Sequence, residues 1–115
     1  MTETIITHDY KGFPVERRIG DGYIEATGIC WVTGKVFGDY YRLPETQEFL
    51  ESLSNKINLP VSDLINVRAG SKWTEEERGT WLHPLVAMSL GAWCSPEFAA
   101  YMRSQLNKPA AQIKP

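Results

Sequence analysis

Residues 79–98, which read GTWLHPLVAMSLGAWCSPEF, contain the end of a strand followed by the start signals of two helices. The run TWL at 80–82 follows a glycine and favours a half-buried strand. Pro84 cannot donate a backbone N–H, but its fixed φ suits the first helical position, so His83 is the predicted N-cap. The run SPE at 95–97 repeats the signal with a capping hydroxyl, a proline and an acid in the first turn.

Both predicted helices carry an apolar stripe at helical spacing. In the first helix the stripe consists of Leu85, Val86, Leu90 and Trp93, and in the second of Phe98, Tyr101, Met102 and Leu106. We expect Trp81 and Trp93 to belong to the core, because large aromatic side chains on an apolar face are mostly buried. The stretch is therefore interpreted as scaffold.

The composition is that of one globular domain. The chain has 115 residues, of which 43% are hydrophobic and 23% charged, enough for a core without metal or disulfide support. No apolar run approaches the roughly 20 residues that a membrane span needs. The N-terminus lacks the basic start and apolar core of a signal peptide, so we expect a cytoplasmic protein.

The sequence shows no pattern typical of an enzyme or a metal site. Cys30 and Cys94 are far apart and are expected to be buried free thiols, and His8 and His83 are isolated. We find no nucleophile with an adjacent base, no paired carboxylates and no phosphate-binding glycine loop. We therefore expect no catalytic activity, no cofactor and no metal.

The first half of the chain predicts a hairpin followed by helices. Strands over 15–19 and 23–26 are joined by a Gly-Asp-Gly turn, and the neighbouring Arg17 and Arg18 indicate a solvated strand face. Thr27 is the predicted N-cap of a short helix over 28–32, which ends at Gly34. Another helix begins at Pro44, and its inward stripe consists of Phe49, Leu50, Leu53 and Ile57. Helix, glycine turn and helix follow each other as in a helix-turn-helix.

The second half predicts another hairpin and the boundaries of the domain. Residues 59–63 form a loop or a single helical turn, and a polar, glycine-bounded loop over 70–79 joins strands at 64–69 and 80–82. The predicted fold is α+β: a small antiparallel sheet of two hairpins, a helix-turn-helix and two C-terminal helices. An N-terminal segment over 1–10 either pairs as an edge strand or frays, the domain spans 11–106, and a disordered tail or linker spans 107–115.

Two motifs carry a resemblance to a known family. GTWLHPL at 79–85, followed by Trp93 and SPEF at 95–98, resembles the C-terminal signature of the KilA-N family, and GYIEAT at 22–27 resembles its N-terminal signature, usually GYVNAT. KilA-N domains occur in phage, bacterial and large DNA-virus proteins and are similar to the APSES domains, which are winged helix-turn-helix modules. The resemblance covers residues 11–106. It implies a DNA-binding domain of a regulatory protein, with the loop at 70–79 as its wing.

The candidate DNA-binding residues lie near the helix-turn-helix turn and in the wing. Arg42 is the first of them, because its planar guanidinium can pair with two acceptors of a phosphate or of a guanine edge. Tyr40 and Tyr41 precede it, and one of this pair must face inward. The other candidates can reach phosphate or a base, or stack on one: Lys35, Thr46, Gln47, Arg68, Ser71, Lys72, Trp73 and Arg78.

The charge distribution keeps a second interpretation open. Fourteen acids exceed twelve bases, for a net charge of −2, so DNA affinity has to come from a local patch. Leu43 and Pro44 follow Arg42 where many relatives have polar or basic residues, and the wing contains Glu75, Glu76 and Glu77. The alternative is a protein-interaction module that keeps the fold, has lost strong DNA binding, and contacts a protein partner or a second copy.

Overall fold

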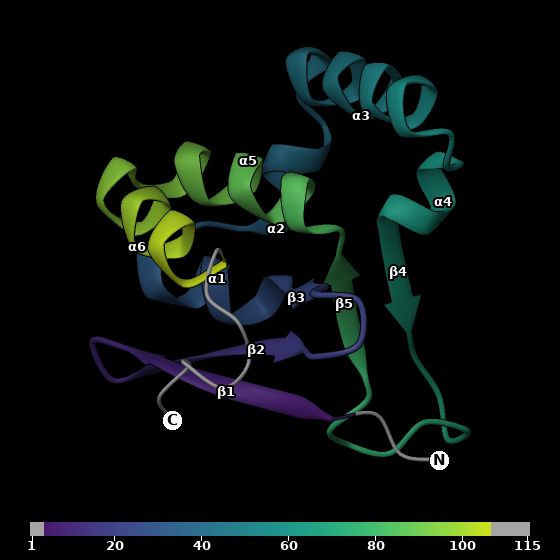
Figure 1. The fold of residues 1–115 in the computed structure, drawn as a ribbon. Coiled ribbons are helices and arrows are strands. Elements are labelled where there is room, and N and C mark those ends of the chain that lie inside the picture. Colours follow the sequence, from purple (N-terminus) through teal and green to yellow (C-terminus); the bar gives the residue numbers. More distant parts are fainter. Residues whose placement is uncertain (1–3, 107–115) are drawn as a thin grey trace.

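The computed structural model describes residues 4–106, which form one antiparallel sheet with helices over one of its faces. The elements in chain order are β1 (Ile5–Tyr10), β2 (Phe13–Arg18), β3 (Ile24–Glu25), α1 (Ala26–Thr33), α2 (Phe37–Tyr41), α3 (Pro44–Ile57), α4 (Val61–Leu64), β4 (Ile65–Arg68), β5 (Gly79–Leu82), α5 (Pro84–Cys94) and α6 (Pro96–Leu106). The five strands have the order β1-β2-β3-β5-β4. Helices α1, α5 and α6 cover the sheet, and α3 lies beyond α5 at the top of Figure 1. The predicted α+β fold is confirmed.

The core lies between the sheet and helices α1, α5 and α6. Ile24 of β3 pairs with Leu82 of β5, and both side chains are buried on the helical face of the sheet. Ile29 of α1, Leu90 of α5 and Phe98 of α6 are fully buried against this layer. Helices α5 and α6 thus contribute the apolar sides that their sequence patterns predict, except that Leu85 of the α5 stripe is exposed.

The capping signals of the two C-terminal helices are confirmed. The backbone N–H of Leu85 donates to His83 Nδ1 over 3.1 Å, and the N–H of Phe98 donates to Ser95 Oγ over 3.3 Å. Gly34 ends α1 in the left-handed conformation with a φ of 71°, as predicted. These signals were readable because each cap and the group that it satisfies lie within a few residues.

The two tryptophans assigned to the core occupy different layers. Trp93 is partly buried, and its ring lies 5.7 Å from that of Tyr40. Trp81 is fully buried, but it projects from the other face of the sheet, where its Nε1 donates to the carbonyl of Glu77 over 2.9 Å. Trp81 therefore forms a second, smaller layer between the sheet and the loop that follows β4.

The N-terminal half contains two hairpins. β1 pairs with β2 over six residue pairs at the edge of the sheet, through a turn at Lys11 and Gly12, both with positive φ. The predicted hairpin between β2 and β3 is present, although β3 has only two residues and pairs through Arg17 and Ile24. Of the segment that could pair or fray, Ile5–Tyr10 pair as an edge strand, and residues 1–3 lie outside the described residues.

The N-cap predicted for α1 is wrong, because Glu25 holds that position and not Thr27. Glu25 Oε1 accepts from the N–H of Thr27 over 3.0 Å, and its Oε2 accepts from the N–H of Thr80 in β5 over 2.9 Å. Gly79 has a φ of +138°, and a Cβ there would lie 2.7 Å from Glu25 Cγ. Glu25 therefore joins α1 to β5, and glycine at position 79 leaves room for it.

Helices α3 and α4 follow the predicted pattern, whereas α2 was not predicted as a helix. α3 begins with Pro44 at its first turn, and its inward stripe consists of buried Leu50 and Leu53 with partly buried Phe49 and Ile57. α4 is a single helical turn, which resolves the alternatives of loop or turn left open for residues 59–63. The tail predicted over 107–115 lies outside the described residues.

Candidate nucleic-acid interface

The turn between α1 and α2 faces the β4–β5 hairpin across a shallow recess. Two adjoining hollows of about 460 and 380 Å³ share Phe37 and Thr80 in their lining, and together they are called the turn–wing recess below. Gly34 is the C-cap of α1, and Val36 is the N-cap of α2, where no side chain forms a capping hydrogen bond. The tight turn between them holds Lys35 at the edge of the recess.

The surface of this recess is largely apolar. Trp31 is 66% exposed, Val67 65%, Val36 60% and Tyr41 40%, and all four side chains line it. They are four of the six exposed large hydrophobic side chains among the residues whose burial the structure describes. Such a concentration of exposed apolar surface is typical of a binding site.

Lys35 lines the recess and Arg42 follows the lining residue Tyr41, and both predicted cations contact other groups of their own chain. The Nζ of Lys35 donates to the carbonyl of Trp93 over 3.3 Å and lies 4.7 Å from the centre of its ring. Arg42 Nη2 lies 2.6 Å from Asp39 Oδ1, and both side chains are more than half exposed. An exposed ion pair of this kind contributes about 0.2–1 kcal/mol, so a phosphate can replace Asp39 at little cost.

Tyr40 and Thr46 are corrections to the predicted interface. Tyr40 is 2% exposed, its hydroxyl donates to Ser89 Oγ over 2.7 Å, and its burial raises its pKa. Thr46 is 4% exposed on the inner side of α3. Neither side chain can touch a ligand on the surface. Tyr40 is thus the inward member of the tyrosine pair, and Tyr41 is the outward one.

Gln47 remains at the surface but is already engaged. Its Nε2 donates to the carbonyl of Tyr41 over 2.6 Å. Since Arg42 and Leu43 lie between α2 and α3, this bond closes the junction between the two helices. Gln47 therefore positions the segment that carries Arg42.

Two of the predicted cations lie against the tryptophan of the wing, the loop over residues 70–79. The guanidinium of Arg68 lies 4.6 Å from the centre of the Trp73 ring, and the ammonium of Lys72 lies 5.1 Å from it. Arg78 Nε donates to the carbonyl of Gly70 over 3.0 Å. Ser71 and Lys72 are exposed, whereas Arg68 and Trp73 are half-buried. Arg68 and Lys72 therefore both form cation–π contacts with the ring of Trp73.

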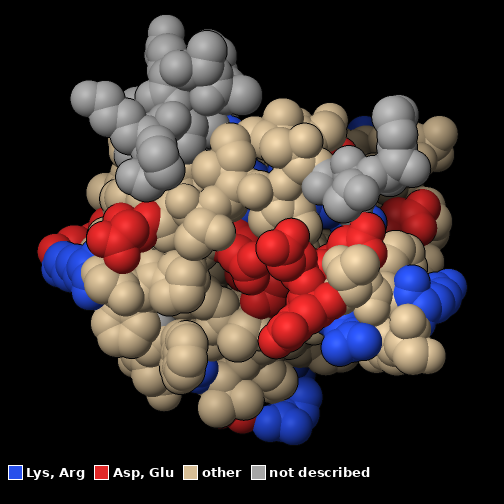
Figure 2. Space-filling model, turned by 90° about the horizontal axis from the view of Figure 1, so that it is seen from below, with Lys and Arg blue, Asp and Glu red and all other residues tan. Residues whose placement is uncertain are grey.

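The acidic run in the wing has two different roles. Glu77 and Thr74 form a reciprocal cap: the N–H of Thr74 donates to Glu77 Oε1 over 2.9 Å, and the N–H of Glu77 donates to Thr74 Oγ1 over 3.2 Å. Glu76 lies near Glu16 of β2, and burial together with the charges of Glu25 and Glu76 raises the pKa of Glu16. Figure 2 shows acidic side chains gathered in the middle of this lower face. DNA phosphates would be repelled from that face.

The sequence predicted that the paired arginines of β2 lie on a solvated face, but both side chains are buried. Arg17 is 7% exposed and Arg18 is 4% exposed. Arg18 bonds to Asp21 and Asn66, and its guanidinium lies 4.5 Å from the ring of Tyr23 and 5.3 Å from that of Trp81. Sequence reasoning missed this cluster because its members come from four separate segments. Its role is to cover Trp81.

Other kinds of site find little support in the described part of the chain. Within residues 4–106 no group of histidine, cysteine, aspartate and glutamate side chains could hold a metal ion. No helix in the same range is long and apolar enough to cross a membrane. Cys30 and Cys94 are buried free thiols, as predicted.

The chain matches the KilA-N domain model over residues 6–112 and belongs to the KilA-N domain family. It is 36% identical over 102 residues to KilA-N domain-containing protein L37 of Acanthamoeba polyphaga mimivirus, which covers 85% of this chain and 21% of the relative. Protein L4 of the same virus is 35% identical over 82 residues, which covers 69% of this chain and 17% of the relative. The chain therefore spans about a fifth of the length of these relatives. No solved structure matches it.

Proposed function

We propose that this KilA-N domain binds duplex DNA through the turn–wing recess and its bordering cations, as part of a regulatory protein and without catalysis. The α1–α2 turn and α3 then form a helix-turn-helix, and residues 70–79 act as the wing. Family membership supports the ligand class. Lys35 and Arg42 would meet the DNA at the turn, and Lys72 and Arg68 at the wing.

The observation that carries this proposal is the separation of charges on the surface. None of the described side chains that line the recess is acidic, although the whole chain carries 14 acids. Glu16 and Glu76 do not line the recess, and the carboxylate of Glu25, whose charge acts on Glu16, is held by bonds from Thr27 and Thr80 of the lining. A polyanion that enters the recess therefore meets the cation Lys35, the charged member of the described lining.

Binding to DNA would exchange intramolecular contacts for phosphate contacts. Arg42 would leave Asp39 for a phosphate, and Lys35 would leave the carbonyl of Trp93. If the four cations proposed at the turn and the wing each neutralise one phosphate, the logarithm of the association constant should fall with the logarithm of salt concentration with a slope of about −3.6.

The test is fluorescence anisotropy of the purified chain with a labelled mixed-sequence duplex at several salt concentrations. Arg42→Ala should weaken binding, and Asp39→Asn should strengthen it, because that change frees Arg42 and removes a nearby negative charge. Lys56→Ala on α3 is the matched control, since Lys56 does not line the recess. Absence of binding at low salt, or a response of all three variants alike, would contradict the proposal.

A protein-interaction module is the second candidate, and the exposed apolar side chains favour it. Trp31, Val36 and Val67 are each at least 60% exposed, which is more apolar surface than phosphate contacts require. The partner would be another protein or a second copy of this domain. A molecular mass that rises with concentration in sedimentation and returns to the monomer in Trp31→Lys, together with no DNA binding, would establish this candidate.

A further inference from the structure

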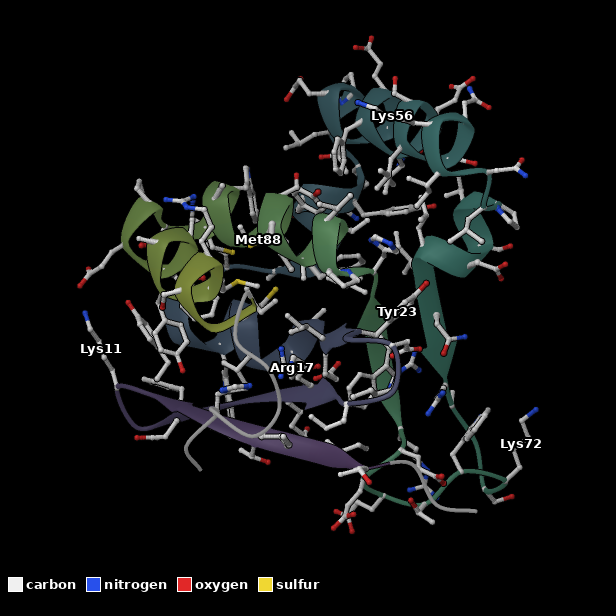
Figure 3. The ribbon with its side chains drawn as sticks, in the orientation of Figure 1. Lys11, Arg17, Tyr23, Lys56, Lys72 and Met88 are labelled. Atoms are coloured by element: carbon white, nitrogen blue, oxygen red, sulfur yellow. The ribbon has the colours of Figure 1, made fainter. Side chains whose placement is uncertain are left out.

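A second hollow lies between α3, α5 and α6, away from the turn–wing recess. It has a volume of about 600 Å³, and its apolar lining consists of Phe49, Leu53, Ile57, Leu85 and Met88. It is called the α3–α5 groove below. Figure 3 places Lys56 on α3 and Met88 on α5, the two helices that face each other across it. It shares no lining residue with the recess.

The groove exists because only part of the apolar stripe of α3 packs against the core. Leu50 and Leu53 are 1% and 6% exposed, whereas Phe49 and Ile57 are only partly buried. On the facing helix Leu85 is 49% exposed and Met88 is half-buried. An apolar hollow of this size between helices is a usual place for a ligand or a partner side chain.

The charged groups at the groove all have one sign. Lys56 of α3 and Arg103 of α6 line it, and no acidic side chain does. Within residues 4–106 neither of these two cations forms an ion pair. The acids of α3, Glu45, Glu48 and Glu51, are exposed and do not line the groove. In a chain with a net charge of −2, the groove thus combines an apolar floor with two cations that have no ion-pair partner among the described residues.

We propose that the α3–α5 groove binds an acidic amphipathic helix of another protein. The apolar side chains of such a helix, spaced at i, i+3, i+4 and i+7, would fill the groove between α3 and α5, and its flanking carboxylates would meet Lys56 and Arg103. This inference is independent of DNA binding, because the groove and the recess are separate surfaces. It makes the domain an adaptor that can hold a protein segment while the recess remains free.

The test uses a labelled synthetic helix with leucine at i, i+3, i+4 and i+7 and glutamate elsewhere on its polar side. One control peptide carries lysine in place of every glutamate, and another carries alanine in place of every leucine. The chain should bind the acidic peptide in fluorescence anisotropy and bind neither control. The double variant Lys56→Glu/Arg103→Glu should lose roughly tenfold or more in affinity and gain affinity for the basic peptide.

The site of binding can be read from the methionine methyl groups by NMR. Met88 lines the groove, whereas Met102 is 3% exposed in the core, so the acidic peptide should shift the Met88 signal and leave that of Met102 in place. Leu85→Asp, on a half-exposed position, should abolish the shift without unfolding the domain. Lys72→Glu in the wing is the matched charge control and should bind the peptide as the unchanged chain does.

Three results would overturn the proposal: no saturable binding, equal binding of the acidic and basic peptides, or a shifted signal that Leu85→Asp does not remove. Self-association that shifts Met88 without peptide would assign the groove to a second copy instead, and would equally overturn it. DNA affinity measured on the same variants should be unchanged for Leu85→Asp, so that failure of either proposal can be recognised separately.

Discussion

Replacing Glu25 by alanine should destabilise the domain more than any single change at its surface. Glu25 is 6% exposed. Its carboxylate accepts hydrogen bonds from the N–H of Thr27 over 3.0 Å, from the hydroxyl of Thr27 over 3.1 Å, and from the N–H of Thr80 over 2.9 Å. The substitution removes the cap of α1 and also leaves a β5 amide without its acceptor.

The expected loss follows from these two contributions. An N-cap contributes about 1 kcal/mol, and a hydrogen bond to a charged group about 1.5–3 kcal/mol. Glu25→Ala should therefore lower the free energy of unfolding by roughly 2.5–4 kcal/mol. That is a large part of the roughly 5–15 kcal/mol that holds a domain together. Urea unfolding followed by circular dichroism, with linear extrapolation, measures it.

Two further variants separate the contributions. Glu25→Asn carries the residue that the family signature usually has here, and it can cap α1 but is one methylene too short to reach Thr80; it should recover about 1 kcal/mol. Gly79→Ala places a Cβ 2.7 Å from Glu25 Cγ, so its cost should be smaller in the Glu25→Ala background. A loss below about 1 kcal/mol for Glu25→Ala, or strict additivity with Gly79→Ala, would refute the reasoning.

Three other predictions concern the interface, the core and pH. Lys72→Ala should lower DNA affinity evenly across sequences and reduce the salt slope by about one, whereas an unchanged slope would exclude a wing contact. Tyr40→Phe should lower the free energy of unfolding by about 0.5–1.5 kcal/mol and leave DNA affinity unchanged; a weaker complex would return Tyr40 to the interface. Because burial and nearby carboxylates raise the pKa of Glu16, its charged form destabilises the folded state. Glu16→Gln should therefore stabilise the domain at neutral pH by less than about 1 kcal/mol. The gain should shrink as pH falls through the raised pKa of Glu16 and be gone below the ordinary value of 4.5, and a pH-independent gain would point to another cause.

Local signals in the sequence were reliable, since cause and effect lie within one turn of the chain. His83 before Pro84, Ser95 before Pro96, and Gly34 after α1 each act on groups one to four residues away. The same holds for the start of α3 at Pro44. These positions divide the chain into the observed elements, and the two family signatures supply the topology that local physics leaves open.

Long-range packing could not be predicted in the same way. The link from Glu25 to Thr80 crosses 55 positions, and a glutamate is an uncommon N-cap, so Thr27 was the better candidate by local preference. The burial of Arg18 depends on Tyr23, Trp81 and Asn66 together. The choice between Tyr40 and Tyr41 rests on Ser89 of α5, which no periodicity in five residues of α2 reveals.

The candidate interface was predictable by residue type more than by geometry. Lys35, Arg42 and Lys72 are exposed, and whether they touch DNA stays a prediction. The apolar surface around them was not foreseen, because Trp31 and Val36 were assigned no role at the surface and are at least 60% exposed. The α3–α5 groove likewise follows from the angle at which α3 meets the core, which its own sequence pattern does not specify.

The buried layer formed by Trp81 holds the wing in one conformation. The Nε1 of Trp81 donates to the carbonyl of Glu77, and Arg78 Nε donates to the carbonyl of Gly70. Thr74 and Glu77 cap each other. These hydrogen bonds hold the loop at both ends and in its middle. A free loop loses about 1–2 kcal/mol per residue in conformational entropy when it is ordered. In this domain the loss of entropy occurs on folding, so the wing is already ordered before binding. A ligand of the wing would therefore have to fit its existing shape and would not change that shape.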